Sequence, residues 1–159
     1  MAVKPPRPRM SRPPLDAEAL ERSALHYAGR YASTRAKLAA FLRRKLRERG
    51  WEGSGEPPVD ALIERMARRG YVDDRAFATA RASSLGRRGY GERRVSDSIR
   101  AAGIDDEDAE EAREVARGNA WTAALRFAER RRIGPFAASQ PARPDREKAI
   151  GAMLRAGHP

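Results

Sequence analysis

Three hexapeptides decide how this chain folds: LRERGW at residues 46–51, IRAAGI at residues 99–104 and MLRAGH at residues 153–158. Each places a glycine at its fifth position, and these glycines are 53 and 54 residues apart. Glycine readily adopts the left-handed backbone that closes many α-helices, so each hexapeptide is expected to end a helix. Recurrence at a fixed period of this length indicates an internal repeat.

Apolar residues recur at helical spacing on both sides of the hexapeptides, which predicts an all-α fold of tandem three-helix repeats with about eight helices. Ser33 or Thr34 is expected to begin the second helix and Asp145 the last one. Four further side chains are expected to act as N-caps: Asp16, Asp73, Asp105 and Asn119. Tyr71 and Phe77 are expected to be core between helices, the seventh helix runs through Trp121, and the eighth carries Ile150 and Leu154.

The repeat divides the chain into four parts. Residues 1–14 are basic and rich in proline, and we expect a disordered arm there. Residues 15–72 and 73–118 each hold one complete repeat, and residues 119–159 hold a third repeat that lacks its last helix. Because repeats of this kind stack on their neighbours, an elongated molecule is expected.

The composition argues against most kinds of catalytic and metal chemistry. The chain has no cysteine and only two histidines, His26 and His158, which we expect to be ordinary surface or boundary residues. No metal site, cofactor site or motif that places a nucleophile beside a base is apparent, so we expect a protein that is not an enzyme. The absence of cysteine fits a cytoplasmic location, and no stretch approaches the roughly 20 apolar residues of a membrane span.

The positive charge is large and uneven. The net charge is +11, and residues 1–50 hold 13 basic and 4 acidic side chains. An excess of this size attracts polyanions and acidic partners. Of the 33 basic residues only 4 are lysine, however, and an arginine-rich and alanine-rich composition also arises from GC-rich codons. Some arginine runs are therefore open to a second interpretation, as solvated faces without a partner.

Two arginine clusters are the candidate contact residues. Arg87, Arg88, Arg93 and Arg94 flank one short turn, and the last two lie in the first turn of a helix, where the helix dipole disfavours a positive charge. The second cluster is Arg43, Arg44 and Arg47, opposite an apolar leucine stripe and therefore expected to be exposed. The run at residues 130–132 ends a helix, where basic residues suit the dipole, so it ranks lower.

Two segments are distinctive: RRGYVDDRAFA at residues 68–78 and RRGYGERRV at residues 87–95. Together with residues 33–38 and 46–50 they resemble the RecX family of RecA regulators, over roughly residues 20 to 157. The residues that carry the resemblance are Gly70, Tyr71, Asp73, Asp74, Phe77, Tyr90 and Gly91. Taken by themselves, these residues are mainly structural, as a cap, helix stops and core.

The resemblance implies a monomer that binds the RecA–DNA filament and suppresses strand exchange, ATP turnover and coprotease activity. It also implies a role in homologous recombination, DNA repair and the SOS response, without a catalytic residue or a cofactor. Whether such a protein caps filament ends or coats the filament groove stays open. The alternative is a stand-alone helical module that binds DNA without sequence preference, through phosphate contacts.

Overall fold

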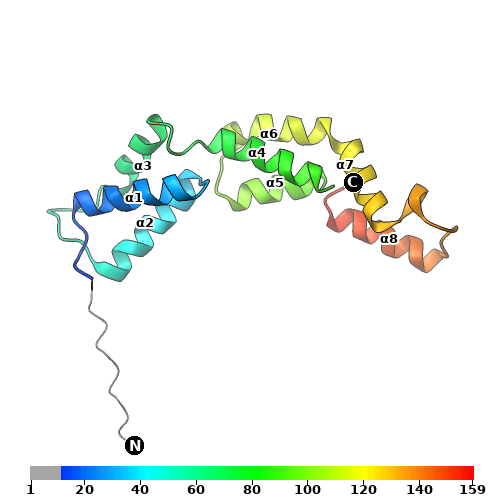
Figure 1. The fold of residues 1–159 in the computed structure, drawn as a ribbon, viewed down its shortest axis with the longest axis horizontal. Helices are drawn as coiled ribbons and strands as arrows, with labels where there is room; N and C mark the ends of the chain where they lie inside the picture. The colour runs from blue at the N-terminus through cyan, green and yellow to red at the C-terminus, as the bar shows by residue number, and fades with distance from the viewer. Residues whose placement is uncertain (1–11) are drawn as a thin grey trace, which may run out of the picture. The chain divides into compact units, whose positions relative to one another are not determined.

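In the computed structural model, residues 12–159 are described, and this part of the chain forms eight α-helices and one short 3₁₀ helix without any strand (Figure 1). The predicted all-α architecture is confirmed. The first eleven residues of the predicted arm lie outside the described residues. The chain divides into two compact units, which is coarser than the three predicted repeats, whose boundaries stay predictions.

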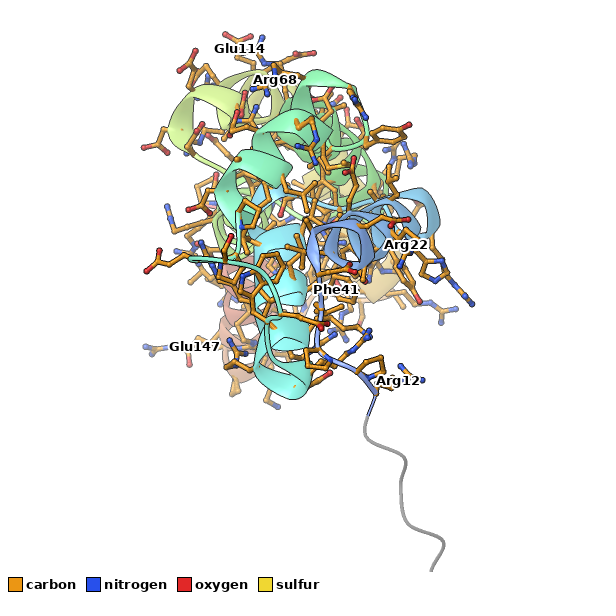
Figure 2. All side chains as sticks on the ribbon, turned by 90° about the vertical axis from the view of Figure 1, so that its left-hand side faces the viewer. Arg12, Arg22, Phe41, Arg68, Glu114 and Glu147 are labelled. Carbon is orange, nitrogen blue, oxygen red and sulfur yellow. The ribbon has the colours of Figure 1, made fainter. Side chains whose placement is uncertain are left out.

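The first unit holds α1 (Ala17–Arg30), most of α2 (Arg35–Arg49) and α3 (Val59–Arg68). Asp16 caps α1, because its carboxylate accepts the Ala19 N–H at 2.7 Å. The ring of Phe41, on α2, stacks on that of Tyr27, on α1, with centroids 4.3 Å apart (Figure 2). The buried apolar side chains on the three helices are Leu20, Ala24, Leu38, Ala39, Leu42, Val59, Leu62, Ile63 and Met66.

The second unit holds residues 32–37 and everything from Val72 onward. Its helices are α4 (Asp74–Arg87), α5 (Glu92–Ala101), α6 (Asp106–Gly118), α7 (Ala120–Arg131), η1 (Gly134–Phe136) and α8 (Arg143–Arg155). Alanines line the contact between α4 and α6, which lets the two helices approach closely; each of the following is at most 2% exposed: Ala78, Ala82, Ala109 and Ala112. Asp73 and Asp105 cap α4 and α6 as predicted, through the Ala76 and Asp108 N–H groups.

Residues 32–37 join the second unit through two long-range hydrogen bonds. Thr34, at the N-terminus of α2, donates its hydroxyl to the Ala102 carbonyl at 2.7 Å. Asp74 accepts the Arg35 N–H at 2.9 Å and is only 7% exposed. Burial raises the pKa of Asp74, and the hydrogen bond from Arg35 offsets part of this rise. Asp74 therefore caps a helix 39 residues earlier, a role beyond the favourable dipole position predicted for it.

The predicted helix stops are confirmed. The three hexapeptide glycines have φ between 74° and 91°, and Gly70 and Gly89 have φ of 75° and 77°. After Gly70, the Tyr71 N–H donates to the Met66 carbonyl at 3.0 Å, which closes α3. No helix within residues 12–159 has the length and apolarity that crossing a membrane requires.

Four large apolar side chains are exposed, and for Tyr71 this contradicts the expected core position. Tyr71 is 49% exposed, because the chain is extended after Gly70 and turns Val72 inward in its place. Trp121, Ile150 and Leu154 are 75%, 60% and 41% exposed, since no third helix of the described chain covers α7 and α8. Phe77 is partly buried against the core, in agreement with its prediction.

Three local predictions were also wrong. Asn119 stands at the predicted N-cap position of α7 but makes no side-chain capping bond there; its side-chain amide donates instead to the Val115 carbonyl at 2.9 Å, at the end of α6. The last helix begins at Arg143 rather than Asp145, because proline is tolerated in the first helical turn. His158 is 3% exposed, and its Nε2–H donates to the Gly89 carbonyl at 3.0 Å, so it is a buried structural residue.

Candidate functional site

The turn between α4 and α5 receives the end of α8. The Gly91 N–H donates to the Ala156 carbonyl at 2.9 Å, and the Arg93 N–H donates to the Gly157 carbonyl at 3.2 Å. A side chain at position 91 would not fit, since a Cβ there would lie 2.4 Å from the Gly157 carbonyl oxygen. Only glycine fits at position 91 because the backbone of Gly157 approaches it closely, which explains the glycine of the Tyr-Gly motif.

This junction forms the floor of a concave pocket of about 480 Å³. Its lining residues come from the turn that follows α4, from α5, from α7 and from the end of α8, and none of them is acidic. The lining residues are Arg88, Tyr90, Arg94, Phe127, Arg130, Arg131, Ala152, Arg155 and Ala156. We call this the arginine pocket, and its cations are Arg88, Arg94, Arg130, Arg131 and Arg155.

Two aromatic rings hold four of these guanidinium groups. The carbon Cζ of Arg88 lies 5.2 Å and that of Arg94 5.9 Å from the Tyr90 ring centroid. The Cζ atoms of Arg130 and Arg131 lie 5.6 and 5.7 Å from the Phe127 centroid. Cations at such distances are attracted to the ring face, so the rings position the charges without neutralising them.

The five arginines are exposed, and none of them forms an ion pair with another described residue. Like charges gathered in a concave surface focus a positive potential that attracts anions. Planar guanidinium groups bind phosphate and carboxylate oxygens with paired hydrogen bonds. The arrangement suits a polyanion. Within residues 12–159 no cluster of histidine and carboxylate side chains could hold a metal ion.

The structure separates the four arginines of the predicted turn cluster. Arg88 and Arg94 line the pocket, whereas Arg87 does not, although it is exposed. Arg93 donates from Nη2 to the Leu154 carbonyl at 2.6 Å, near the C-terminal end of α8. Arg93 therefore stabilises the junction, and the predicted turn cluster supplies two of the five cations.

Sequence reasoning missed the other three. Arg130 and Arg131 ranked low because their place at the end of α7 has a local explanation, yet α7 brings them beside the α4–α5 turn. Arg130 also donates from Nη1 to the Arg88 carbonyl at 2.6 Å. Arg155 lies two residues before the stop glycine at position 157, and its contact with the pocket depends on a junction between segments over 60 residues apart.

The predicted cluster on α2 lies in the first unit, and its arginines are exposed as expected. Two of them are already paired: Arg43 lies 2.9 Å from Asp60, and Arg44 lies 3.7 Å from Glu48. Arg47 has no ion pair among the described residues. The cluster therefore presents less free charge than its sequence indicates.

The remaining motif residues have structural roles. Asp73 caps α4, Gly70 ends α3, and Tyr90 lies beneath two pocket arginines. The ring of Phe77 carries the Lys37 ammonium 4.5 Å from its centroid. That the motif as a whole is mainly structural stays a prediction.

Comparison with known proteins relates the sequence and the fold of this chain to one protein family. A family model described as "RecX, second three-helix domain" matches residues 73–112, which include α4, α5 and the start of α6. The regulatory protein RecX of Myxococcus xanthus is 32% identical over 164 residues, covering 96% of this chain and 84% of that protein. Its counterpart in Thermus thermophilus is 37% identical over 103 residues, or 65% of this chain and 69% of the relative.

A solved structure titled "Crystal structure of regulatory protein RecX" shares the fold. It matches with a TM-score of 0.61 at 18% identity, covering 90% of this chain and 69% of that one. At this identity the likeness speaks for the fold alone.

Proposed function

Because this chain belongs to the RecX family of regulatory proteins, we propose that it restrains recombination by binding the RecA–DNA filament through the arginine pocket. In this proposal the protein suppresses strand exchange, ATP hydrolysis and coprotease activity by occupying the filament. It performs no chemistry of its own, and its contact surface is a set of fixed positive charges.

The observation that carries the proposal is the gathering in one pocket of five guanidinium groups, none of which forms an ion pair within residues 12–159. A nucleoprotein filament is rich in anions, with DNA phosphates and acidic side chains as ligands for arginine. Backbone hydrogen bonds at Gly91 and Arg93 join the start of α5 to the end of α8, and the Arg130 side chain bonds to the Arg88 carbonyl, so the cations are preorganised before the filament arrives.

The test is RecA strand exchange and ATP hydrolysis on single-stranded DNA, with this protein at substoichiometric amounts. We expect the wild-type protein to suppress both activities and the variant R88A/R94A/R131A/R155A to suppress neither. Arg130 is left in place because it also bonds to the Arg88 carbonyl. The matched control is R43A/R44A/R47A on α2, which is expected to keep most of the inhibition.

Two results would count against the proposal. If the wild-type protein leaves RecA activities unchanged, the protein does not regulate the filament. If the pocket variant inhibits as well as the wild type while keeping its helical circular dichroism, the contact surface lies elsewhere.

The unpaired arginines also support a second candidate, a stand-alone module that binds DNA phosphates. For such a module the affinity for naked duplex DNA falls steeply with salt, with a slope near −0.9 per phosphate contact. A filament-specific protein binds naked DNA weakly and the preformed filament stoichiometrically. Titrating the protein onto both substrates at two salt concentrations separates the candidates.

A further inference from the structure

The arginine pocket continues into a second cavity, which lies beside it in the same unit of the chain. This cavity has a volume of about 380 Å³ and shares Arg88, Tyr90 and Arg94 with the arginine pocket. We call it the side cavity. The residues that line the side cavity alone come from α4 and α5, and they are Arg81, Leu85, Asp97, Ser98 and Ala101.

The lining of the side cavity differs in chemistry from that of the arginine pocket. Its own residues supply one cation, one carboxylate, one hydroxyl group and two apolar side chains, whereas the arginine pocket has five cations and no carboxylate. Arg81 donates from Nε to the Ser98 hydroxyl oxygen at 2.8 Å, so the one cation is held against the wall. Arg100 contacts one oxygen of Asp97 at 3.2 Å, and a carboxylate has acceptor sites for further hydrogen bonds.

Together the two cavities present strong positive charge at one end and hydrogen-bonding and apolar groups at the other. A nucleotide has the same division, with phosphates at one end and sugar hydroxyls and a flat base at the other. Guanidinium groups bind phosphate oxygens, and a carboxylate accepts hydrogen bonds from ribose hydroxyls. Both volumes lie within the range of about 300–1,000 Å³ that is usual for small-molecule sites.

A nucleic-acid strand fits the pair of cavities less well than a single nucleotide does. A strand carries a phosphate at every step, and following both cavities would bring one of these phosphates to the Asp97 carboxylate. Like charges at short range repel each other. The carboxylate therefore favours a ligand whose phosphates are confined to one end.

We propose that the two cavities together bind a nucleoside triphosphate. The phosphate chain lies among the arginines of the arginine pocket, and the sugar and base occupy the side cavity, where Asp97 accepts from the ribose hydroxyls and Leu85 packs against the base. Binding is reversible and breaks no bond of the ligand. Nucleotide binding does not depend on RecA. The nucleotide and the filament share the same arginines and therefore compete, a consequence that rests on the proposed function.

The experiment is isothermal titration calorimetry on the full chain, without RecA or DNA. The probes are ATP, ADP, AMP, inorganic tripolyphosphate and 2′,3′-dideoxy-ATP. We expect the affinity to rise about tenfold with each phosphate from AMP to ATP, because each one meets a further guanidinium group. Tripolyphosphate should bind at least about tenfold more weakly than ATP, since it has no group that enters the side cavity.

Asp97→Ala separates the two ends of the ligand. It should weaken ATP about tenfold and leave tripolyphosphate and 2′,3′-dideoxy-ATP unchanged, because only ATP brings ribose hydroxyls to this position. The matched control is Asp60→Ala on α3, which also removes an exposed carboxylate that pairs with an arginine, in the other unit of the chain. This control should leave the binding of every probe unchanged.

Three outcomes would overturn the proposal. The first is the absence of saturable ATP binding, and the second is equal affinity for ATP and tripolyphosphate, which would limit the ligand to phosphate alone. The third is a short single-stranded oligothymidylate that binds more tightly than ATP and gains affinity in Asp97→Ala, which would make a nucleic-acid strand the occupant. Because no assay here contains RecA, a failure of RecA inhibition leaves these readouts unaffected, and the two proposals fail separately.

Discussion

The arginine cluster on α2 and the arginine pocket are both rich in guanidinium groups but differ in the surroundings of those groups. On α2, Arg43 and Arg44 face carboxylates at 2.9 and 3.7 Å. In the arginine pocket, five guanidinium groups lie around one cavity, and four of them lie over aromatic rings. A cation over a ring keeps its full charge, whereas a cation beside a carboxylate is largely neutralised.

The difference shows that the number of arginines in a segment is a poor measure of its attraction for anions. What matters is whether the fold brings acidic residues near them. On α2 the carboxylates come from the same helix and from α3, while around the pocket the neighbouring elements supply further arginines and no acid. The following predictions test this difference between the α2 cluster and the arginine pocket.

The largest effect is expected on the affinity for DNA. Each lost arginine–phosphate contact costs at least about 1 kcal/mol, so R88A/R94A/R131A/R155A should weaken binding to a short duplex about thousandfold at low salt. Its salt slope should also fall by about three to four. For R43A/R44A/R47A we expect at most a tenfold loss and a slope change of about one, measured by fluorescence anisotropy. Equal losses in the two variants would remove the contrast.

A smaller effect is expected from the ring beneath two of the cations. Tyr90→Leu removes the face over which Arg88 and Arg94 lie, so both side chains must be ordered when an anion binds, and an ordering cost of about 0.5–1.5 kcal/mol per side chain corresponds to roughly tenfold weaker binding. Tyr90→Phe keeps the ring and should bind like the wild type. If both variants bind alike, the ring does not position the charges.

Within the predicted turn cluster, stability should distinguish Arg93 from Arg87. Arg93→Ala loses the hydrogen bond to the Leu154 carbonyl and should lower the free energy of unfolding by about 1 kcal/mol in urea titrations. Arg87 forms no ion pair or side-chain hydrogen bond within residues 12–159, so Arg87→Ala should stay within about 0.5 kcal/mol of the wild type. If Arg87→Ala lowers the free energy of unfolding more than Arg93→Ala does, Arg93 does not have the structural role.

The smallest effect concerns the paired cluster. A double-mutant cycle with Arg43→Ala and Asp60→Ala should give a coupling energy below about 1 kcal/mol, because both side chains are exposed. Asp60→Ala alone removes the carboxylate that pairs with Arg43, and it should therefore raise the affinity for DNA slightly. A coupling of several kcal/mol would mean that this pair is shielded from solvent.

Most of the fold was predictable because its signals are local. Asp16, Asp73 and Asp105 cap the helices that follow them, and the stop glycines end helices within the same few residues. Such features depend only on backbone geometry near the residue. The exposure of Trp121 was not predictable in this way, since an apolar stripe indicates a face to be covered and does not show what covers it.

The candidate site was predicted only in part, because its other half depends on contacts between distant segments. Arg88 and Arg94 share a turn and were identified from sequence, while Arg155 reaches the same pocket through the junction of Gly91 with the end of α8. The buried hydrogen bond of His158 with the Gly89 carbonyl, 69 residues away, belongs to this junction. No local sequence pattern predicts a hydrogen-bond partner 69 residues away.

The short segment at residues 32–37 limits how the protein can be divided into fragments. Thr34 and Arg35 supply hydrogen-bond donors to Ala102 and to the Asp74 carboxylate. A fragment that starts at the second motif lacks both donors, so Asp74 loses the hydrogen bond from Arg35, which contributes about 1 kcal/mol. We therefore expect limited proteolysis to leave residues 32–37 uncut. An expression fragment that contains the second unit should include these residues.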